Sequence, residues 1–213
     1  MCKTDFVLRA CCGSSPEKTT FLERQDTPSI GREIVREAVQ ADFIPDPVVA
    51  WHEAGHATVG IMVGMIPEAI LAGAGGFVTW RDQAPSRSAE IVMLLAGDFA
   101  GGMAVRTEHR PVDGELSPWL DLVRKPAGGY CDRCRIIRAL VIEHGVDASD
   151  AAILSAYREA EARTLETLHR MEVRGAIRAI AGELMGVGRL TGDAVTEIAS
   201  RYVVPGSLVG ELK

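Results

Sequence analysis

The pattern of apolar and polar positions predicts a mainly helical domain whose clearest element begins at Asp46-Pro47. Asp is a favoured N-cap and Pro suits the first helical turn, so we expect a helix over Val48–Met65. This segment is apolar around almost its whole circumference, which is typical of a buried helix. Gly64 and Pro67 mark its end.

A second buried helix is predicted to run to about Val105, with Ser86 or Ser88 as its N-cap. After a polar loop over 106–127, further helices are expected at about 129–144, 149–171, 174–186 and 192–202. Thr191 is a natural N-cap for the last of them, and 187–191 is expected to be a plain connection. In the longest helix the positions at helical spacing are Ile153, Ala156, Ala160, Leu165, Leu168 and Met171.

Two short extended segments, 69–71 and 77–80, flank a glycine-rich turn at 73–76. They predict a small β-hairpin beside the first helix, so the expected fold class is mainly α with one small β element. We expect the domain to cover 46–205. Residues 1–45 form a partly flexible extension with a helix over Ser29–Gln40, and 206–213 form a C-terminal tail.

Composition limits the classes of function open to this chain. Its 213 residues are 47% hydrophobic and 24% charged, which is ordinary for a globular protein. The 23 Lys and Arg against 29 Asp and Glu give a net charge of −6, which argues against nucleic acid as a partner. The most apolar stretch, Ala57–Ile66, is far shorter than the roughly 20 residues of a membrane span. Because the five cysteines are an odd number and no signal peptide is recognised, we expect a cytoplasmic protein.

The candidate chemistry lies in His52-Glu53-Ala54-Gly55-His56, within the first predicted helix. Residues four apart share a helix face, so both imidazoles can reach one metal ion. Two His ligands and an open position suit catalytic Zn²⁺, which activates a water and polarises a carbonyl. Glu53 is placed to act as the general base. Packed histidines with no ligand are the alternative, but unpaired polar groups in an apolar helix cost roughly 2–7 kcal/mol each.

The residues alone leave the third ligand open. A metzincin would need Gly and His where this chain has Val59 and Met62, so that class is rejected. The remaining candidates are His109, His144, His169, Glu90, Asp98 and Asp132.

The run from Val49 to Ala57 resembles the zinc helix of the peptidase domain in the FtsH family of ATP-dependent zinc proteases. Ile91–Gly97 resembles that family's second helix, and Gly128-Gly129-Tyr130-Cys131-Asp132 its Gly-x-x-x-Asp segment. Leu184–Ile198 resembles its terminal helix–turn–helix, so the likeness covers roughly 48–202.

The resemblance implies that His52, His56 and Asp132 are the metal ligands and that Glu53 is the base. It also implies that the hairpin binds extended peptides by strand addition, with Gly76, Phe77, Val78 and Thr79 as substrate-binding residues. The function so implied is a zinc-dependent endopeptidase that hydrolyses unfolded or short polypeptides through Glu-assisted attack of zinc-bound water.

The chain also departs from the family. Residues 1–45 contain no phosphate-binding loop, and the paired glutamates usual in the family are replaced around Phe99-Ala100-Gly101-Gly102. We therefore expect activity that does not need ATP, with either further copies of the chain or a separate protein delivering the substrate. A catalytically silent interaction module is the alternative function. A redox pair formed by Cys131 and Cys134 is a weaker one, because a single C-x-x-C on a helix is more often a pair of small apolar residues.

Overall fold

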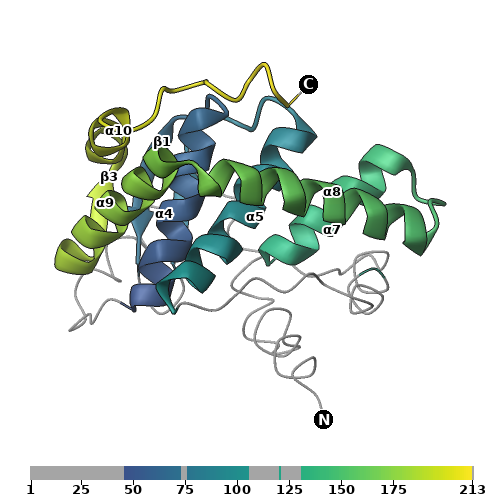
Figure 1. The fold of residues 1–213 in the computed structure, drawn as a ribbon, viewed down its shortest axis with the longest axis horizontal. Coiled ribbons are helices and arrows are strands. Elements are labelled where there is room, and N and C mark those ends of the chain that lie inside the picture. The colour runs from purple at the N-terminus through teal and green to yellow at the C-terminus, as the bar shows by residue number, and fades with distance from the viewer. Residues whose placement is uncertain (1–45, 73–75, 106–119, 121–130, 213) are drawn as a thin grey trace, which may run out of the picture.

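The computed structural model describes residues 46–72, 76–105, 120 and 131–212 (Figure 1). The predicted helix over Ser29–Gln40, most of the glycine-rich turn and nearly all of the 106–127 loop lie outside these residues. The described elements, labelled as in Figure 1, are α4 (Pro47–Met62), β1 (Pro67–Leu71), β2 (Phe77–Trp80), α5 (Arg87–Ala104), α7 (Asp132–His144), α8 (Asp150–His169), α9 (Met171–Val187), β3 (Arg189–Thr191) and α10 (Gly192–Ser200). They confirm the prediction of a mainly helical fold with a small β element.

Helix α4 begins as its sequence predicts. The Asp46 carboxylate accepts a hydrogen bond from the Val48 backbone N–H at 2.8 Å, and Pro47 occupies the first helical position. Almost the whole helix after its first turn is buried, in agreement with its apolar circumference. It ends at Met62 rather than Met65, because Gly64 takes a φ of +92° that closes the helix.

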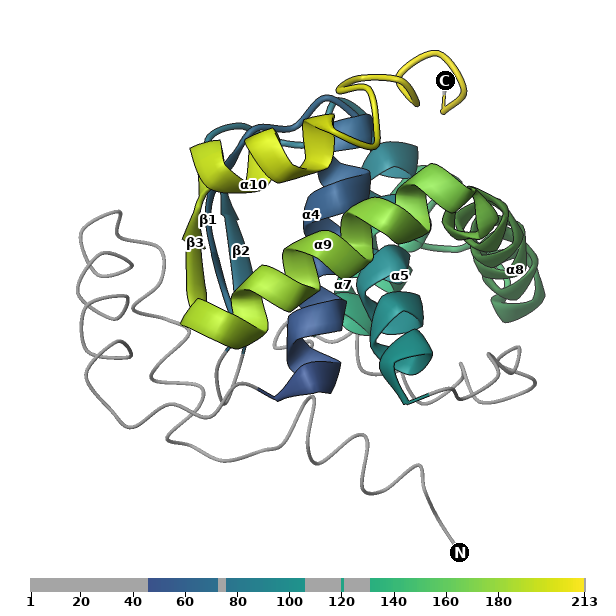
Figure 2. The same cartoon turned by 60° about the vertical axis from the view of Figure 1, so that its left-hand side comes forward.

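Helices α4 and α5 pack against each other at the centre of the molecule (Figure 2). A Cβ on Gly55 would lie 2.4 Å from the Ala96 carbonyl oxygen, so only glycine allows the two backbones to come this close. Helix α9 packs on α4, and α7 and α8 pack on α5. The functional side chains of α4 are therefore held against a second, closely fitted helix.

The sheet has the strand order β2-β1-β3, with both pairs antiparallel. β1 and β2 form the predicted hairpin, in which Ile70 lies opposite Val78. The third strand was not predicted: Leu190 pairs with Ile70 from the other side, in a segment expected to be a plain connection. Three residues are too short to show an alternating pattern, so only the contact with β1 defines this strand. Thr191 still caps α10, as expected, by accepting from the Ala194 N–H at 3.3 Å.

The boundaries of α8 and α9 correct another expectation. The predicted helix over 149–171 breaks at Arg170, which has an extended backbone, and Met171 begins α9 with 77% of its surface exposed. The Arg174 guanidinium donates to the Leu168 carbonyl at 3.1 Å. This hydrogen bond satisfies a carbonyl at the end of α8, where a helix leaves its last carbonyls without helical partners. Ser86, rather than Ser88, caps α5 through the Ala89 N–H at 3.1 Å.

The C-terminal segment lies against the end of α4. The N–H groups of Gly206 and Leu208 donate to the carbonyls of Ile61 and Met62, both at 2.9 Å. Leu208 and Leu212 are buried in the hydrophobic core. Residues 206–212, which the sequence suggests as a tail, thus close the last turn of α4.

Candidate metal centre

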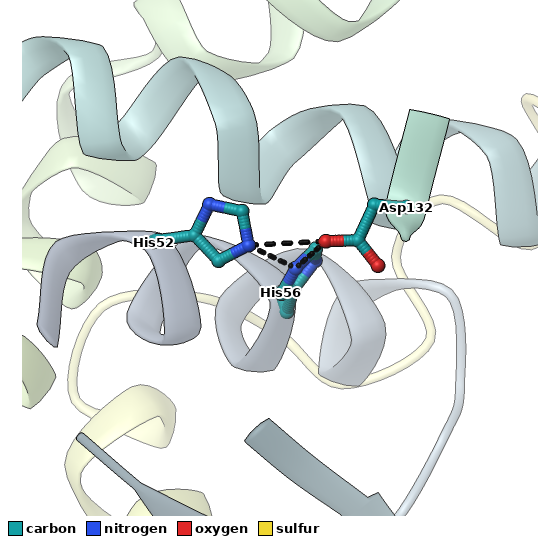
Figure 3. Close-up of side chains that lie close together, drawn as sticks. All are labelled: His52, His56 and Asp132. Carbon is teal, nitrogen blue, oxygen red and sulfur yellow. Dashed lines mark hydrogen bonds and ion pairs between the residues drawn. The ribbon is translucent and has the colours of Figure 1, made fainter. Parts of the chain in front are cut away.

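Three side chains from two helices meet at one point (Figure 3). The Nε2 atoms of His52 and His56 lie 2.9 Å apart, and each is 3.1 Å from Oδ2 of Asp132. The two histidines are one turn apart on α4, and Asp132 is the first residue of α7. This group of two imidazole nitrogens and one carboxylate oxygen could hold a metal ion.

The polar surroundings of His56 fix its orientation. Its Nδ1 lies 2.9 Å from the Met93 carbonyl oxygen, which can only accept, so Nδ1 carries the proton and donates. In the neutral ring Nε2 then presents its lone pair toward His52 and Asp132. A Cβ on Gly97 would lie 2.3 Å from Cε1 and Nε2 of His56, so the ring rests directly on the α5 backbone at this glycine.

A carboxylate lies behind His52. Nδ1 of His52 is 3.8 Å from Oδ1 of Asp98, and the other oxygen of Asp98 is 3.8 Å from the Arg133 guanidinium. Burial raises the pKa of the Asp98 carboxyl, an effect that His52 and Arg133 oppose. Asp98 therefore faces Nδ1 of His52, whereas Nε2 of the same ring points toward His56 and Asp132. A carboxylate in this position commonly orients a metal-binding histidine.

The electrostatics of the group favour a positive charge. Burial would raise the pKa of Asp132, but its hydrogen-bonding contacts with His52 and His56 outweigh burial and hold that pKa well below the usual range. Burial disfavours the charged form of His56, yet the contact with Asp132 raises the pKa of His56 to about 9. The ionised carboxylate thus attracts a cation, whether a proton or a metal ion, to the two nitrogens.

Glu53 lies beside the group without belonging to it. It is 4% exposed, and burial raises its pKa from 4.5 to about 6 although His56 and His52 lower it. A Cβ on Gly76 would come within 2.7 Å of Oε1 of Glu53, so the Glu53 carboxylate can take this position only because Gly76 has no side chain. Glu53 and the three metal-site residues open into one pocket of about 140 Å³.

The chemistry of the donor set fits a divalent metal ion. Two histidines and one carboxylate are the protein ligands of several zinc hydrolases, in which a fourth position stays open to the reactants. The oriented Nε2 atom of His56 and the acidic residue facing Nδ1 of His52 are the supports that such ligands need.

The fold shows which of the six candidates for a third metal ligand lie near His52 and His56. Among the described residues only Asp132 joins the two histidines, whereas Asp98 lies behind His52 and Glu90 pairs with Arg135 at 3.1 Å. His144 and His169 end α7 and α8 and do not join the group, and His109 lies outside the described residues.

The predicted substrate-binding residues lie on and next to β2. Gly76, Phe77 and Val78 line the 140 Å³ pocket, whereas the Thr79 hydroxyl donates back to the Ala69 carbonyl at 3.4 Å. Four further residues line this pocket without a signal in the sequence that marks them as site residues: Trp80, Met93, Leu94 and Arg135. They come from two helices and a strand, and no local motif connects them.

The two cysteines of the C-x-x-C differ in their surroundings. Cys131 is half-buried and precedes the first residue of α7, whereas Cys134 is fully buried in the core. The burial of Cys134 is the environment of a small apolar residue. Whether the pair has a redox role remains a hypothesis.

No protein-family model matches this chain, and no curated protein matches it. None of the helices in the described ranges has both the length and the apolar character that a membrane span requires.

Proposed function

We propose that this protein is a zinc-dependent endopeptidase of unfolded or short polypeptides, similar to the peptidase domain of the FtsH family but acting without ATP. The observation that carries the proposal is the meeting of His52, His56 and Asp132 beside the buried Glu53, in a pocket bordered by a sheet edge. The order of these residues along the chain also agrees with the resemblance of its motifs to that family.

His52, His56 and Asp132 would hold the metal ion. When bound, Zn²⁺ supplies a Lewis acid that polarises the carbonyl of the peptide bond. Glu53 reaches the same pocket from the neighbouring helix position, so its carboxylate can accept the proton of the attacking water and return it to the departing amine. The burial of Glu53 keeps bulk water from solvating this proton acceptor.

The substrate class follows from the sheet. Within the described residues β2 pairs only with β1, so its other edge can bind one further strand. A peptide added there would run past Gly76, Phe77 and Val78, which line the pocket. Strand addition needs an extended backbone, and an unfolded or short polypeptide offers one whereas the interior of a folded protein does not.

The test compares metal content with cleavage. Zinc would be measured by mass spectrometry after dialysis, and hydrolysis of an unfolded casein-type substrate would be followed with and without a chelator. We expect Glu53→Gln to keep its zinc and lose roughly 10²- to 10⁴-fold in rate. Glu161→Gln is the matched control, because Glu161 is also 4% exposed but lies on α8.

Asp132→Ala should lose most of its zinc, and Asp150→Ala should not. Asp150 is the first residue of α8 as Asp132 is of α7, so the pair of variants separates a metal ligand from a helix-terminal acid. If the zinc-loaded wild-type protein cleaves no unfolded substrate, the enzyme proposal is wrong and the interaction module takes its place.

A further inference from the structure

Arg133 lies between two parts of the molecule that the proposed mechanism leaves unconnected: the carboxylate behind His52 and the buried face of α8. It is the second residue of α7, directly after Asp132. One of its guanidinium nitrogens is 3.8 Å from Oδ2 of Asp98, on α5. Neighbouring residues of a helix point roughly 100° apart, so Asp132 can face the histidines while Arg133 faces another helix.

Asp98 in turn faces His52. Its Oδ1 is 3.8 Å from Nδ1 of His52, so the two oxygens of Asp98 lie against different partners. Figure 3 shows Nδ1 of His52 on the side of the ring that is turned away from Asp132. Both contacts of Asp98 are ion-pair contacts, longer than a hydrogen bond. A carboxylate with one such contact can turn about its side-chain bonds, whereas contacts on both sides hold it in one orientation.

Tyr157 contacts Arg133 from α8. Burial raises the pKa of the Tyr157 hydroxyl, whereas the charge of Arg133 and a hydrogen bond from Arg133 lower that pKa. An arginine side chain can only donate, so the Tyr157 oxygen is the acceptor of this hydrogen bond. The side chains thus form a continuous series from α8 through α7 and α5 to α4, in the order Tyr157, Arg133, Asp98 and His52.

The members of this series are largely shielded from water. The side chains of Arg133 and Asp98 expose 26% and 34% of their surface, and Tyr157 is 1% exposed. Ion pairs that are partly buried are screened by salt much less than exposed pairs. Because α5, α7 and α8 pack against one another, the three helices that carry these groups have fixed relative positions. A shift of Arg133 would therefore be passed on to Asp98.

We propose that Arg133 is a positioning residue of the metal centre, which acts on His52 through Asp98. Tyr157 holds Arg133 in place from α8. Arg133 keeps Asp98 against Nδ1 of His52, and this contact keeps Nε2 of the same ring directed toward the other ligands. The inference rests on the metal binding that the proposed function requires, and not on peptide cleavage. The first turn of α7 then has two tasks, since Asp132 supplies a ligand atom and Arg133 orients a ligand on another helix.

The sign of the effect on zinc affinity distinguishes this role from a simple effect of charge. Arg133 is a cation near a site for a cation, so removal of its charge would by itself strengthen zinc binding. Loss of a group that supports a ligand weakens metal binding instead, by roughly 10- to 100-fold. We therefore expect Arg133→Gln to bind zinc about tenfold more weakly than the wild-type protein in competition with a chelating dye.

A double-mutant cycle with Asp98→Asn tests the route of the effect. Because Arg133 acts through Asp98, Arg133→Gln should weaken zinc binding in the wild-type protein but cause no further weakening when Asp98 is already replaced. Equal losses in the two backgrounds would overturn the proposal, and so would tighter zinc binding by Arg133→Gln alone. Arg138→Gln is the matched control, because Arg138 is also a partly buried arginine of α7. This variant should keep the zinc affinity of the wild-type protein.

The orientation of His52 is measured by NMR of the histidine ring N–H groups in the zinc-loaded protein. We expect the Nδ1–H resonance of His52 to be visible in the wild-type protein and lost through exchange with water in Arg133→Gln. His56 is the internal control, because its Nδ1 donates to the Met93 carbonyl at 2.9 Å and should stay protected. A general loosening of the fold would affect both histidines. An unchanged His52 resonance in Arg133→Gln would overturn the proposal.

Tyr157→Phe is the second variant and keeps the inference testable if Arg133→Gln does not fold. It removes the hydroxyl that accepts from Arg133 and keeps the buried ring. We expect zinc binding to weaken by roughly two- to tenfold, the range of one hydrogen bond. As with Arg133→Gln, this loss should disappear in the Asp98→Asn background. Equal zinc affinity of Tyr157→Phe and the wild-type protein would overturn the series from α8 to His52.

The outcomes separate this inference from the proposed function. A protein that binds zinc and gives the expected cycle but cleaves no peptide would refute the peptidase proposal and leave the role of Arg133 standing. A protein that cleaves peptides, but whose zinc affinity and His52 resonance do not depend on Arg133, would overturn the inference and leave the peptidase proposal standing. A wild-type protein that binds no zinc would overturn both.

Discussion

Replacing Gly97 by alanine should weaken metal binding at the proposed site although Gly97 supplies no ligand atom itself. The new Cβ would stand 2.3 Å from Cε1 and Nε2 of His56, whereas ordinary contacts begin near 3.4 Å, so the ring must move by about 1.1 Å. Met93 lies one turn before Gly97 on the same helix, and its carbonyl holds Nδ1 of His56 at 2.9 Å. Displacement of the ring from α5 would stretch that bond to about 4 Å and break it.

The magnitude follows from three contributions. Overpacking costs about 1–3 kcal/mol and the lost hydrogen bond about 0.5–1.5 kcal/mol. The higher helix propensity of alanine offsets about 1 kcal/mol of this. Zinc affinity should fall further than stability, because a site tolerates ligand shifts of only about 0.2 Å. We expect a loss of about 100-fold or more, at or beyond the upper end for groups that support a ligand.

Gly101→Ala is the matched control one turn further along α5. Its Cβ would meet Cβ of His52 and two atoms of Val48, all at 3.5 Å, which is an ordinary contact. Both variants gain the same helix propensity, so the difference between them in zinc affinity and in stability reports the collision with His56 alone. Zinc affinity would be measured by competition with a chelating dye, and stability by urea unfolding followed by circular dichroism. Equal zinc affinity in the two variants would refute the placement of the ring.

Three further predictions concern Asp98, Gly76 and Tyr157, a buried residue of α8. Asp98→Asn should lower zinc affinity by roughly 10- to 100-fold but not abolish binding, because Asp98 faces His52 from behind; unchanged affinity in a dye competition would contradict this. Gly76→Ala should keep its zinc but lose peptide cleavage, since its Cβ would displace the Glu53 carboxylate; a variant that cleaves normally would exclude the proposed position of Glu53. Burial raises the pKa of Tyr157, although Arg133 lowers it, so the stability that the neutral phenol contributes is full below pH 10.0 and is lost as pH rises above it. In urea melts, Tyr157→Phe should therefore lose less stability between pH 9 and 11 than the wild-type protein, and parallel losses would refute the assignment.

The sequence predicts well those structural features that depend only on residues close together in the chain. The N-cap at Asp46 and the burial of α4 follow from a short stretch of chain, and so does the shared face of His52 and His56. The hairpin is equally local, because two extended segments flank one glycine-rich turn. The break at Arg170 could not be predicted in this way, because no glycine or proline marks it. The side chain of Arg174, from the next helix, satisfies the Leu168 carbonyl at the break.

The choice among candidates for a third metal ligand shows where local reasoning ends. Several acidic and histidine residues had the right chemistry, and the family resemblance alone singled out Asp132. The fold adds a physical reason, because α7 begins at the point where α4 presents its two imidazoles, whereas Asp98 approaches the opposite side of His52. The resemblance also included Gly97, and the structure explains that glycine through its contact with the ring of His56.

By itself, then, the sequence determined a helix that carries two histidines and a glutamate, because a periodicity of 3.6 residues places positions four apart on one face. Only the tertiary structure decided the remainder: the pairing of β3 with β1, and the space shared by Trp80, Met93 and Arg135. These contacts join residues far apart in the chain. No residue in them carries a local signal, because the position of each depends on how α4, α5, α7 and the sheet pack together.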